Sequence, residues 1–235
     1  MHIAEGMLPT QWWLGYSGAA AVLVAKGLID YQKKSEKWPM FKQLTGVMTA
    51  GVFIISLMPI PVPVAGSSSH PGGTPLAAIL MGPTVTAPMS VVALLFQALF
   101  LAHGGLTTLG ANTLTLALFG GMVGYLVFRL SQRSGLSLFM AGALAGFLGD
   151  LAIYMGTSIQ LALAIHGDAG IFKVFVGTLL AFMPTQFPLA ILEGAFTGLA
   201  LKYVAAHRPD ILRSLGVIKG DTLPVKAKEV GEYGR

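Results

Sequence analysis

The 235-residue sequence contains no cysteine and few charged side chains. Without cysteine the chain can form neither disulfide bonds nor thiolate metal sites, so its softer metal ligands must come from histidine and methionine. Asp, Glu, Lys and Arg together make up 11% of the residues, against about a quarter in soluble domains. This shortage of charge argues against a soluble protein and is typical of an integral membrane protein.

One long stretch, residues 43–128, contains no Asp, Glu, Lys or Arg at all. Apolar side chains make up 54% of the chain, and its mean hydropathy is +0.72. A soluble fold has no need of so long an uncharged stretch, whereas several successive membrane crossings would produce it. The sequence therefore predicts an all-α integral membrane protein with a single membrane domain.

The formal net charge of +5 raises the question of a nucleic-acid partner. The basic residues, however, lie in the segments between apolar runs and in the tail that follows the last run. That is the pattern produced when Lys and Arg are held on the cytoplasmic side of a membrane. We therefore expect contact with lipid and none with nucleic acid.

Five apolar runs are long enough to cross a bilayer. They lie at about 11–30, 43–62, 110–128, 138–165 and 174–201. The stretch 75–102 is ambiguous, because Pro83 and Pro88 interrupt it and prolines end helices. It forms either one kinked helix or two short helices near 75–86 and 89–102.

The distribution of basic residues decides between these two readings. Lysines at 26–42 place one loop in the cytoplasm, and Arg129 and Arg133 place another there. Two loops on one side are joined by an even number of crossings, so 75–102 crosses twice. The sequence thus predicts about seven helices in residues 1–205, with an external N-terminus, followed by a basic cytoplasmic tail in residues 206–235.

Small residues at helical spacing predict close packing between some of these helices. Gly120 and Gly124 form one GxxxG pair, and Gly142 and Gly146 form another. Asp150 and Glu193 are acidic residues in the interior of two of the apolar runs. Ionisable groups are costly inside a membrane, so their presence suggests a function. Here they could cross-link two helices or form a step in an ion path.

His2 follows the terminal amine directly, and His is too large a second residue for the usual removal of the initiator Met. We therefore expect Met1 to stay. The amine, the amide nitrogen of His2 and its imidazole can then form fused chelate rings around a divalent cation. Nitrogen donors of this kind suit Ni(II), Cu(II) and related late first-row ions. The alternative is that His2 is simply a solvated terminal residue.

The predicted topology places His2, His70, His103 and His166 on the external side. His70 lies in a loop rich in Pro, Gly and Ser, which is suited to hold a ligand in place. His103 lies at the outer end of a helix, where Gly104 and Gly105 are a plausible C-cap. His70 and His103 are therefore further candidate ligands, although either could be an ordinary loop residue, and His166 is interpreted as a surface residue.

Two polar neighbours are candidates for supporting such a site rather than binding the ion. Asn112 lies close to the external end of its helix, and Ser69 directly precedes His70. Side chains of this kind orient the ligands of a metal.

Three separate motifs resemble one known family. The opening MHIAEGMLP, the loop SSSHPGGTPLAAILMGP and the stretch LLFQALFLAHGGLTTLGAN resemble the CbiM/NikM family. Its members are the substrate-binding membrane subunits of energy-coupling factor transporters for cobalt and nickel. The resemblance extends to about residue 205, and the order and spacing of the motifs agree.

The resemblance implies a metal site formed by the amine of Met1, the amide and imidazole of His2, and the imidazole of His70, with His103 as a weaker candidate. It also implies a multi-pass protein of a prokaryotic cell membrane with three kinds of partner. These are a small accessory membrane subunit, a transmembrane coupling subunit and cytoplasmic ATPases. The chain itself lacks the GxxxxGK[ST] phosphate loop, so ATP hydrolysis must occur on another polypeptide.

The resemblance implies Co(II) or Ni(II) as the transported substrate, and no organic cofactor is expected. At equal geometry the Irving–Williams order favours nickel. The form of the first two motifs is more similar to the cobalt branch, in which uptake usually serves cobalamin biosynthesis, and we favour cobalt.

Two other functions remain as alternatives. An ion-coupled secondary transporter would use Asp150 or Glu193 as a proton relay. An intramembrane protease would use Ser17 of the GYSG stretch as a nucleophile, but a nucleophilic serine needs a base within hydrogen-bond reach. No histidine is expected inside a helix at that depth, so we expect a transporter subunit and not an enzyme.

Overall fold

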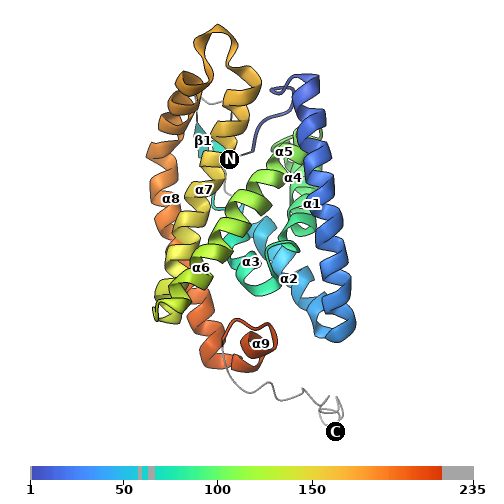
Figure 1. Cartoon of the computed structure of the whole chain (residues 1–235), viewed down its shortest axis with the longest axis vertical. Helices are drawn as coiled ribbons and strands as arrows, with labels where there is room; N and C mark the ends of the chain where they lie inside the picture. Colours follow the sequence, from blue (N-terminus) through green and yellow to red (C-terminus); the bar gives the residue numbers. More distant parts are fainter. Residues whose placement is uncertain (1, 58–59, 63–66, 219–235) are drawn as a thin grey trace.

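The structure is a computed structural model that describes residues 2–57, 60–62 and 67–218. Helices dominate it (Figure 1). The helical elements are α1 (Thr10–Lys37), α2 (Met40–Ile55), α3 (Thr74–Met81), α4 (Thr86–Leu101), α5 (Leu109–Leu114), the π-helix η1 (Thr115–Met122), α6 (Val123–Arg133), α7 (Leu138–Ile165), the 3-10 turn η2 (Gly167–Ala169), α8 (Ile171–His207) and α9 (Pro209–Ser214). Two short antiparallel strands, β1 (Ile60–Val62) and β2 (Ser67–Ser69), precede α3.

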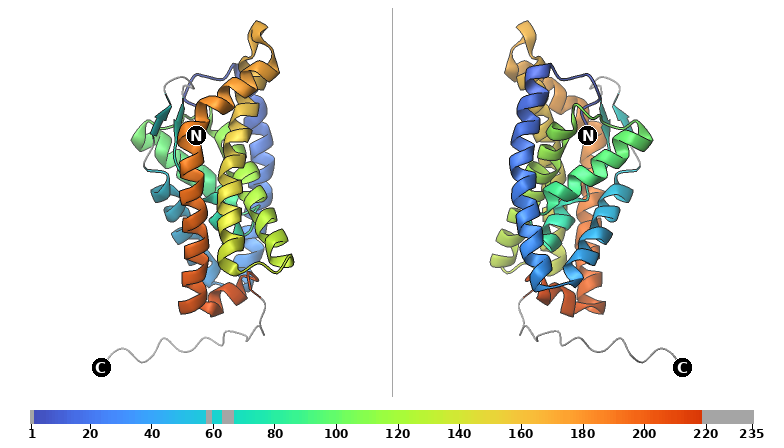
Figure 2. Two further views of the ribbon diagram at one scale, coloured as in Figure 1. Left: turned by 90° about the vertical axis from the view of Figure 1, so that its left-hand side faces the viewer. Right: turned by 90° about the vertical axis from the view of Figure 1, so that its right-hand side faces the viewer.

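The long helices run roughly along one axis of an elongated bundle (Figures 1 and 2). α7 and α8 pack along most of their length, α6 lies against α7, and α1 lies on the far side of the bundle beside α5. The short α3 lies in the middle. The loop between α7 and α8 marks one end of the molecule, and α9 lies at the other end.

Four helical segments are long and apolar enough to cross a membrane: α1, the continuous run Leu109–Arg133, α7 and α8. α2 and α4 are shorter apolar helices. Many large apolar side chains point outward, including Phe100, Phe172 and Leu199. Such an exterior suits lipid, so the prediction of a mostly helical, multi-pass membrane protein is confirmed. The number of seven crossings stays a prediction.

The segment around residues 75–102 forms two helices, as expected. α3 spans only eight residues, and its neighbours cover nearly all of its side chains, so other protein segments shield this short helix. The turn between α3 and α4 is made by Gly82 to Val85. Pro88, expected to bound this turn, lies instead in the first turn of α4, where its missing N–H has no helical partner to lose.

Two features depart from the expected boundaries. The strands β1 and β2 lie within and after the expected run 43–62, whose helix ends at Ile55. They form a hairpin that the all-helical prediction did not include, because alternating Pro and Val in this segment cannot continue a helix. At the other end α8 reaches His207, and Leu212 of α9 is buried in a cluster with Phe128 and Leu201. The domain division at residue 205 remains a prediction.

The predicted close packing of small residues is confirmed where α7 meets α8. A Cβ atom built on Gly146 would lie 2.7 Å from the carbonyl oxygen of Glu193, and one on Gly142 would lie 3.0 Å from Cα of Gly198. Gly124 likewise approaches Pro75 of α3, with 2.8 Å between the added Cβ and the proline Cβ. These contacts hold α7 against α8, and α6 against α3, the helix that follows the loop that carries His70.

Candidate metal centre

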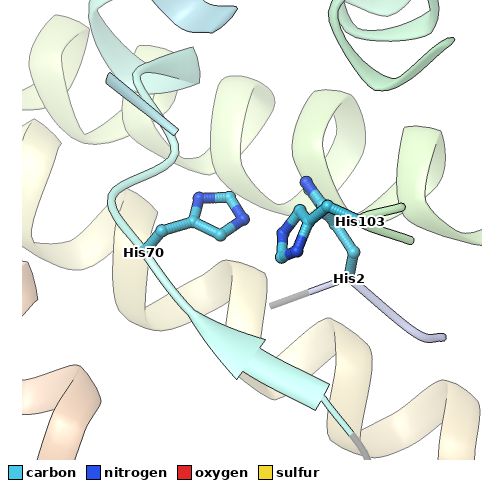
Figure 3. Close-up of side chains that lie close together, drawn as sticks. All are labelled: His2, His70 and His103. Atoms are coloured by element: carbon cyan, nitrogen blue, oxygen red, sulfur yellow. The ribbon is translucent and has the colours of Figure 1, made fainter. Parts of the chain in front are cut away.

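Three imidazoles from distant parts of the chain meet at one point (Figure 3). His2 comes from the N-terminal segment, His70 from the loop between β2 and α3, and His103 from the loop that follows α4. Their ring centroids are 4.5 Å apart for His2 and His70, 4.7 Å for His2 and His103, and 5.2 Å for His70 and His103. One nitrogen from each ring lies within 4.8 Å of the others. Neutral imidazoles so arranged can bind a single transition-metal ion.

The environment keeps these rings neutral. His2 and His70 are 2% and 0% exposed, and His103 is partly covered. Burial lowers the pKa of His2 and of His70 well below the usual range, and lowers the pKa of His103 to about 4. Each ring therefore keeps a lone pair at neutral pH, as a metal ligand must.

His70 is held in a defined tautomer. Its Nδ1 donates to the carbonyl oxygen of Pro71 at 2.8 Å, because a carbonyl can only accept. The lone pair is therefore on Nε2, which is buried and has no hydrogen-bond partner within the part of the chain that the structure describes. The ring is turned toward the other two imidazoles (Figure 3). A buried acceptor nitrogen left in this position fits an ion that binds there.

The backbone on both sides of His70 is fixed by helices α7 and α8. The hydroxyl of Tyr154 accepts from the N–H of His70 at 3.1 Å and lies 3.3 Å from its carbonyl oxygen. Glu193 accepts from the N–H groups of Gly72 and Gly73 at 2.5 and 2.8 Å. Gly73 needs a left-handed conformation, with φ at +68°, to direct its N–H this way and begin α3.

Ser69, expected to support the site, shares a 2.8 Å hydrogen bond with the hydroxyl of Thr185 in α8. It thus fixes the residue before His70 from the same helix that provides Glu193. Sequence reasoning missed the role of Glu193 at this loop and treated it as a helix cross-link or proton relay. The acidic residue in an apolar helix was the signal, but nothing in the sequence indicated its partner 120 residues away.

Asn112 holds the N-terminal segment in place, next to His2. Its Oδ1 accepts from the N–H of Ile3 at 2.8 Å, and its Nδ2 donates to the carbonyl oxygen of Ile3 at 3.2 Å. The hydroxyl of Thr108 donates to the same carbonyl at 2.8 Å. Glu5 accepts from the hydroxyl and the N–H of Thr107 at 2.5 and 3.1 Å. The first residues are therefore bound along α5 and the loop before it.

Gly104 and Gly105 serve a different purpose from the one predicted. The residue that caps α4 is Ala102, which adopts a left-handed conformation with φ at +48°. A Cβ on Gly105 would lie 2.8 Å from Cα of Glu5, and one on Gly104 would lie 3.4 Å from Cβ of His2. The two glycines leave space for the N-terminal segment, so the C-cap interpretation is wrong.

The remaining candidates lie elsewhere. Met1 is outside the described residues. His166 is in the turn after α7, and His207 stacks on Tyr203 at the end of α8. Ser17 packs against α5, where a Cβ on Gly110 would lie 2.6 Å from its hydroxyl oxygen. Ser17 therefore lies at a close contact between α1 and α5.

Comparison with known proteins identifies the family of the chain. The sequence matches the CbiM family, described as "Cobalt uptake substrate-specific transmembrane region", over residues 2–211. The chain belongs to the CbiM family. Members of this family are transporter components and not enzymes, as expected for this chain.

Several relatives match along nearly their whole length. The cobalt transport protein CbiM of Sorangium cellulosum is 48% identical over 93% of this chain and 97% of its own. A putative cobalt transport protein CbiM of Methanocaldococcus jannaschii is 40% identical over 95% of both chains. A crystal structure of a truncated transition metal transporter is 27% identical, with a TM-score of 0.76 over 88% of this chain and 99% of that one.

Proposed function

We propose that this chain is the substrate-capture subunit of an ATP-driven energy-coupling factor importer for a divalent transition metal. The observation that carries the proposal is the group of three imidazoles that includes the buried Nε2 of His70, which has no hydrogen-bond partner among the described residues. A nitrogen with a lone pair and no donor to satisfy it is costly in a protein interior, unless a cation binds there.

The proposed ligands are the amine of Met1, the amide nitrogen and imidazole of His2, and the imidazole of His70. The ring of His103 is close enough to supply a further donor. Asn112 and Ser69 support the site, since they hold the residues beside His2 and His70. The first residues would close over the ion once it has entered from outside.

Co(II), taken up for cobalamin biosynthesis, is the substrate that the family description and the names of the relatives favour. The donor set does not by itself distinguish Co(II) from Ni(II), because both ions accept imidazole and amide nitrogens. Ni(II) is therefore the second candidate, and it has the advantage in intrinsic affinity.

The proposed topology has seven crossings, with the N-terminus outside and the C-terminus in the cytoplasm. The partners are a small accessory membrane subunit, a transmembrane coupling subunit and cytoplasmic ATPases. Residues 26–42, predicted as a loop, form the last turns of α1 and the start of α2. We propose that this corner and the turn between α3 and α4 face the partners. Glu193 is engaged by Gly72 and Gly73 and Asp150 by Gln186, which favours a structural role over the proton relay of a secondary transporter.

The test is the metal affinity of the purified protein with its native first residue, measured by competition with a chelator for Co(II) and for Ni(II). We expect stoichiometric binding of one ion. His70→Ala should abolish it, whereas His166→Ala, outside the cluster, should not. Equal binding by wild type and His70→Ala would refute the site.

A further inference from the structure

A chain of three buried side chains runs from His2 into the bundle. Nε2 of His2 lies 2.6 Å from Oε1 of Gln97 in α4. The amide nitrogen of Gln97 donates to the hydroxyl oxygen of Ser56, at the end of α2. That hydroxyl lies 2.8 Å from the carbonyl oxygens of both Val52 and Phe53. His2, Gln97 and Ser56 are at most 4% exposed.

The end of this chain determines its direction. The carbonyl oxygens of Val52 and Phe53 can only accept, so they take the one proton of the Ser56 hydroxyl. Ser56 must then accept from Gln97, which turns the NH₂ group of Gln97 toward Ser56 and its oxygen toward His2. That oxygen also only accepts, so the proton of the His2 ring is on Nε2. The lone pair of His2 is therefore on Nδ1.

The position of this lone pair decides whether His2 can chelate. Nδ1 is bonded to Cγ, so an ion on Nδ1 closes a six-membered ring with the amide nitrogen of the same residue. Nε2 is on the far side of the ring and cannot bind the same ion. The chain through Gln97 and Ser56 thus selects the tautomer that the proposed clamp requires.

His70 has the opposite tautomer, with its proton on Nδ1 and its lone pair on Nε2. In both residues the proton is directed to an acceptor that has no proton to give back: the carbonyl of Pro71 for His70, and the oxygen of Gln97 for His2. Outer partners that fix the tautomer of a ligating histidine are typical of metal sites.

We propose that Gln97, oriented by Ser56, is a positioning residue that locks His2 in the tautomer with its lone pair on Nδ1. The inference rests on the proposed function, since it assigns the purpose of the lock to metal capture. The tautomer itself is a property of the metal-free protein and can be measured separately.

The experiment begins with Ser56→Ala, which removes the acceptor for Gln97 without touching His2. The Gln97 amide is then able to turn its NH₂ group toward His2, which draws the proton to Nδ1. We expect the affinity for Ni(II) or Co(II) to fall about tenfold, the lower end of the range for outer partners of metal ligands. In the metal-free protein, the ¹⁵N shifts of His2, assigned with a His2→Gln variant, should change from Nε2-protonated toward a mixture.

The deciding variant is the double substitution Ser56→Ala with Gln97→Glu. A carboxylate offers only acceptor oxygens, so it keeps the proton of His2 on Nε2 without help from Ser56. We expect the affinity and the ¹⁵N shifts to return to the wild-type values. Ser90→Ala is the matched control, because Ser90 is a buried serine of α4 whose hydroxyl donates only to the Thr86 carbonyl.

Unchanged affinity and ¹⁵N shifts in Ser56→Ala would overturn the lock. If the double variant binds the metal as weakly as Ser56→Ala, the lock is also overturned, since the loss of affinity would then come from altered packing. If Ser56→Ala does not fold, Gln97→Glu and Gln97→Met in the wild-type background give the same comparison, and equal losses in both count against the proposal. Wild-type protein with the expected ¹⁵N shifts but no bound metal would refute the proposed function and leave the lock standing.

Discussion

The N–H of Gly73 donates a 2.8 Å hydrogen bond to Oε1 of Glu193, across 120 residues of sequence. The other oxygen of the same carboxyl group accepts from Gly72. One side chain from the middle of α8 thus holds the loop that begins just after His70, and it does so at the N-terminus of α3, where backbone N–H groups lack helical partners. The position of His70 therefore depends on α8.

Glu193→Ala should weaken metal binding although Glu193 does not touch the cluster. Two buried N–H groups would lose their acceptor, at about 1–3 kcal/mol each, and the loop would lose its anchor. We expect a lower melting temperature in detergent and at least a tenfold loss of affinity. The melting temperature and affinity of Glu193→Gln should lie between those of wild type and Glu193→Ala, since glutamine keeps one acceptor oxygen. Glu36→Ala, at an exposed position of α1, is the control, and an effect as small as that of the control would disprove the anchoring role.

The three imidazoles should contribute unequally. His70→Ala removes the ring whose buried Nε2 has no hydrogen-bond partner in residues 2–57, 60–62 and 67–218, so binding should fall by two orders of magnitude or more. His103 is less buried, and His103→Ala should retain binding with a changed visible absorption spectrum of the bound Co(II). Isothermal titration and absorption spectroscopy measure both effects. Loss of binding in His103→Ala as severe as in His70→Ala would make His103 a principal ligand.

A tag on the N-terminus should abolish binding, because it replaces the free amine and occupies the space that the first residues fill beside Gly104 and Gly105. A tag of the same sequence on the C-terminus should have no effect, since α9 lies at the opposite end of the bundle (Figure 1). Cleaving the N-terminal tag to restore the native start should restore binding. Tight binding by the uncleaved fusion would contradict the role of the amine.

The metal-free protein should lose stability as the pH falls from about 6.5 to about 4. Burial lowers the pKa of His103 to about 4 and that of His2 and His70 below the ordinary value, which is about 6.5 in an unfolded chain. Within this window the unfolded chain binds more protons, so acid favours unfolding. Melting temperatures across the window should fall less steeply for His103→Ala than for wild type or His166→Ala. Identical slopes of melting temperature against pH in His103→Ala and wild type would show that His103 does not contribute to the loss of stability in acid.

Gly146→Ala should destabilise the contact between α7 and α8. The added methyl group would lie 2.7 Å from the Glu193 carbonyl oxygen and 2.9 Å from Cα of Gly194. These are backbone atoms, so the helices must separate, at a cost of about 1–3 kcal/mol. Gly177→Ala in α8 meets nothing within 4 Å and is the matched control. Thermal melting in detergent compares the two, and equal melting temperatures would argue against tight packing at Gly146.

The sequence predicted the helical membrane fold because long uncharged runs have few other uses. His2 and His70 were candidates because their surroundings are unusual: a terminal amine for one, a loop rich in Pro, Gly and Ser for the other. The roles of Gln97 and Glu193 could not be predicted in the same way. Their helices are apolar on every side, so periodicity does not indicate which face is internal, and their partners are 95 and 120 residues away.

The short elements were also hard to foresee. β1 lies in a stretch that continues the apolarity of α2, and hydropathy alone does not separate a strand from a helix end. β2 consists of three serines, which hydropathy does not mark as a strand. Ala102 caps α4 although two glycines follow one residue later, since Gly104 and Gly105 leave space for the approach of the N-terminal segment. In this case a tertiary contact, rather than a local preference, determines where glycine is used.

His2 and the groups that hold it are separated by a long stretch of chain. Gln97 and Asn112 follow about a hundred residues on, and the loop after His70 gains the acceptors for Gly72 and Gly73 only when Glu193 of α8 has been inserted. A polypeptide truncated before α8 would keep the partners of the N-terminal segment but would lack this anchor. We therefore expect the proposed ion site to become complete only late in biosynthesis.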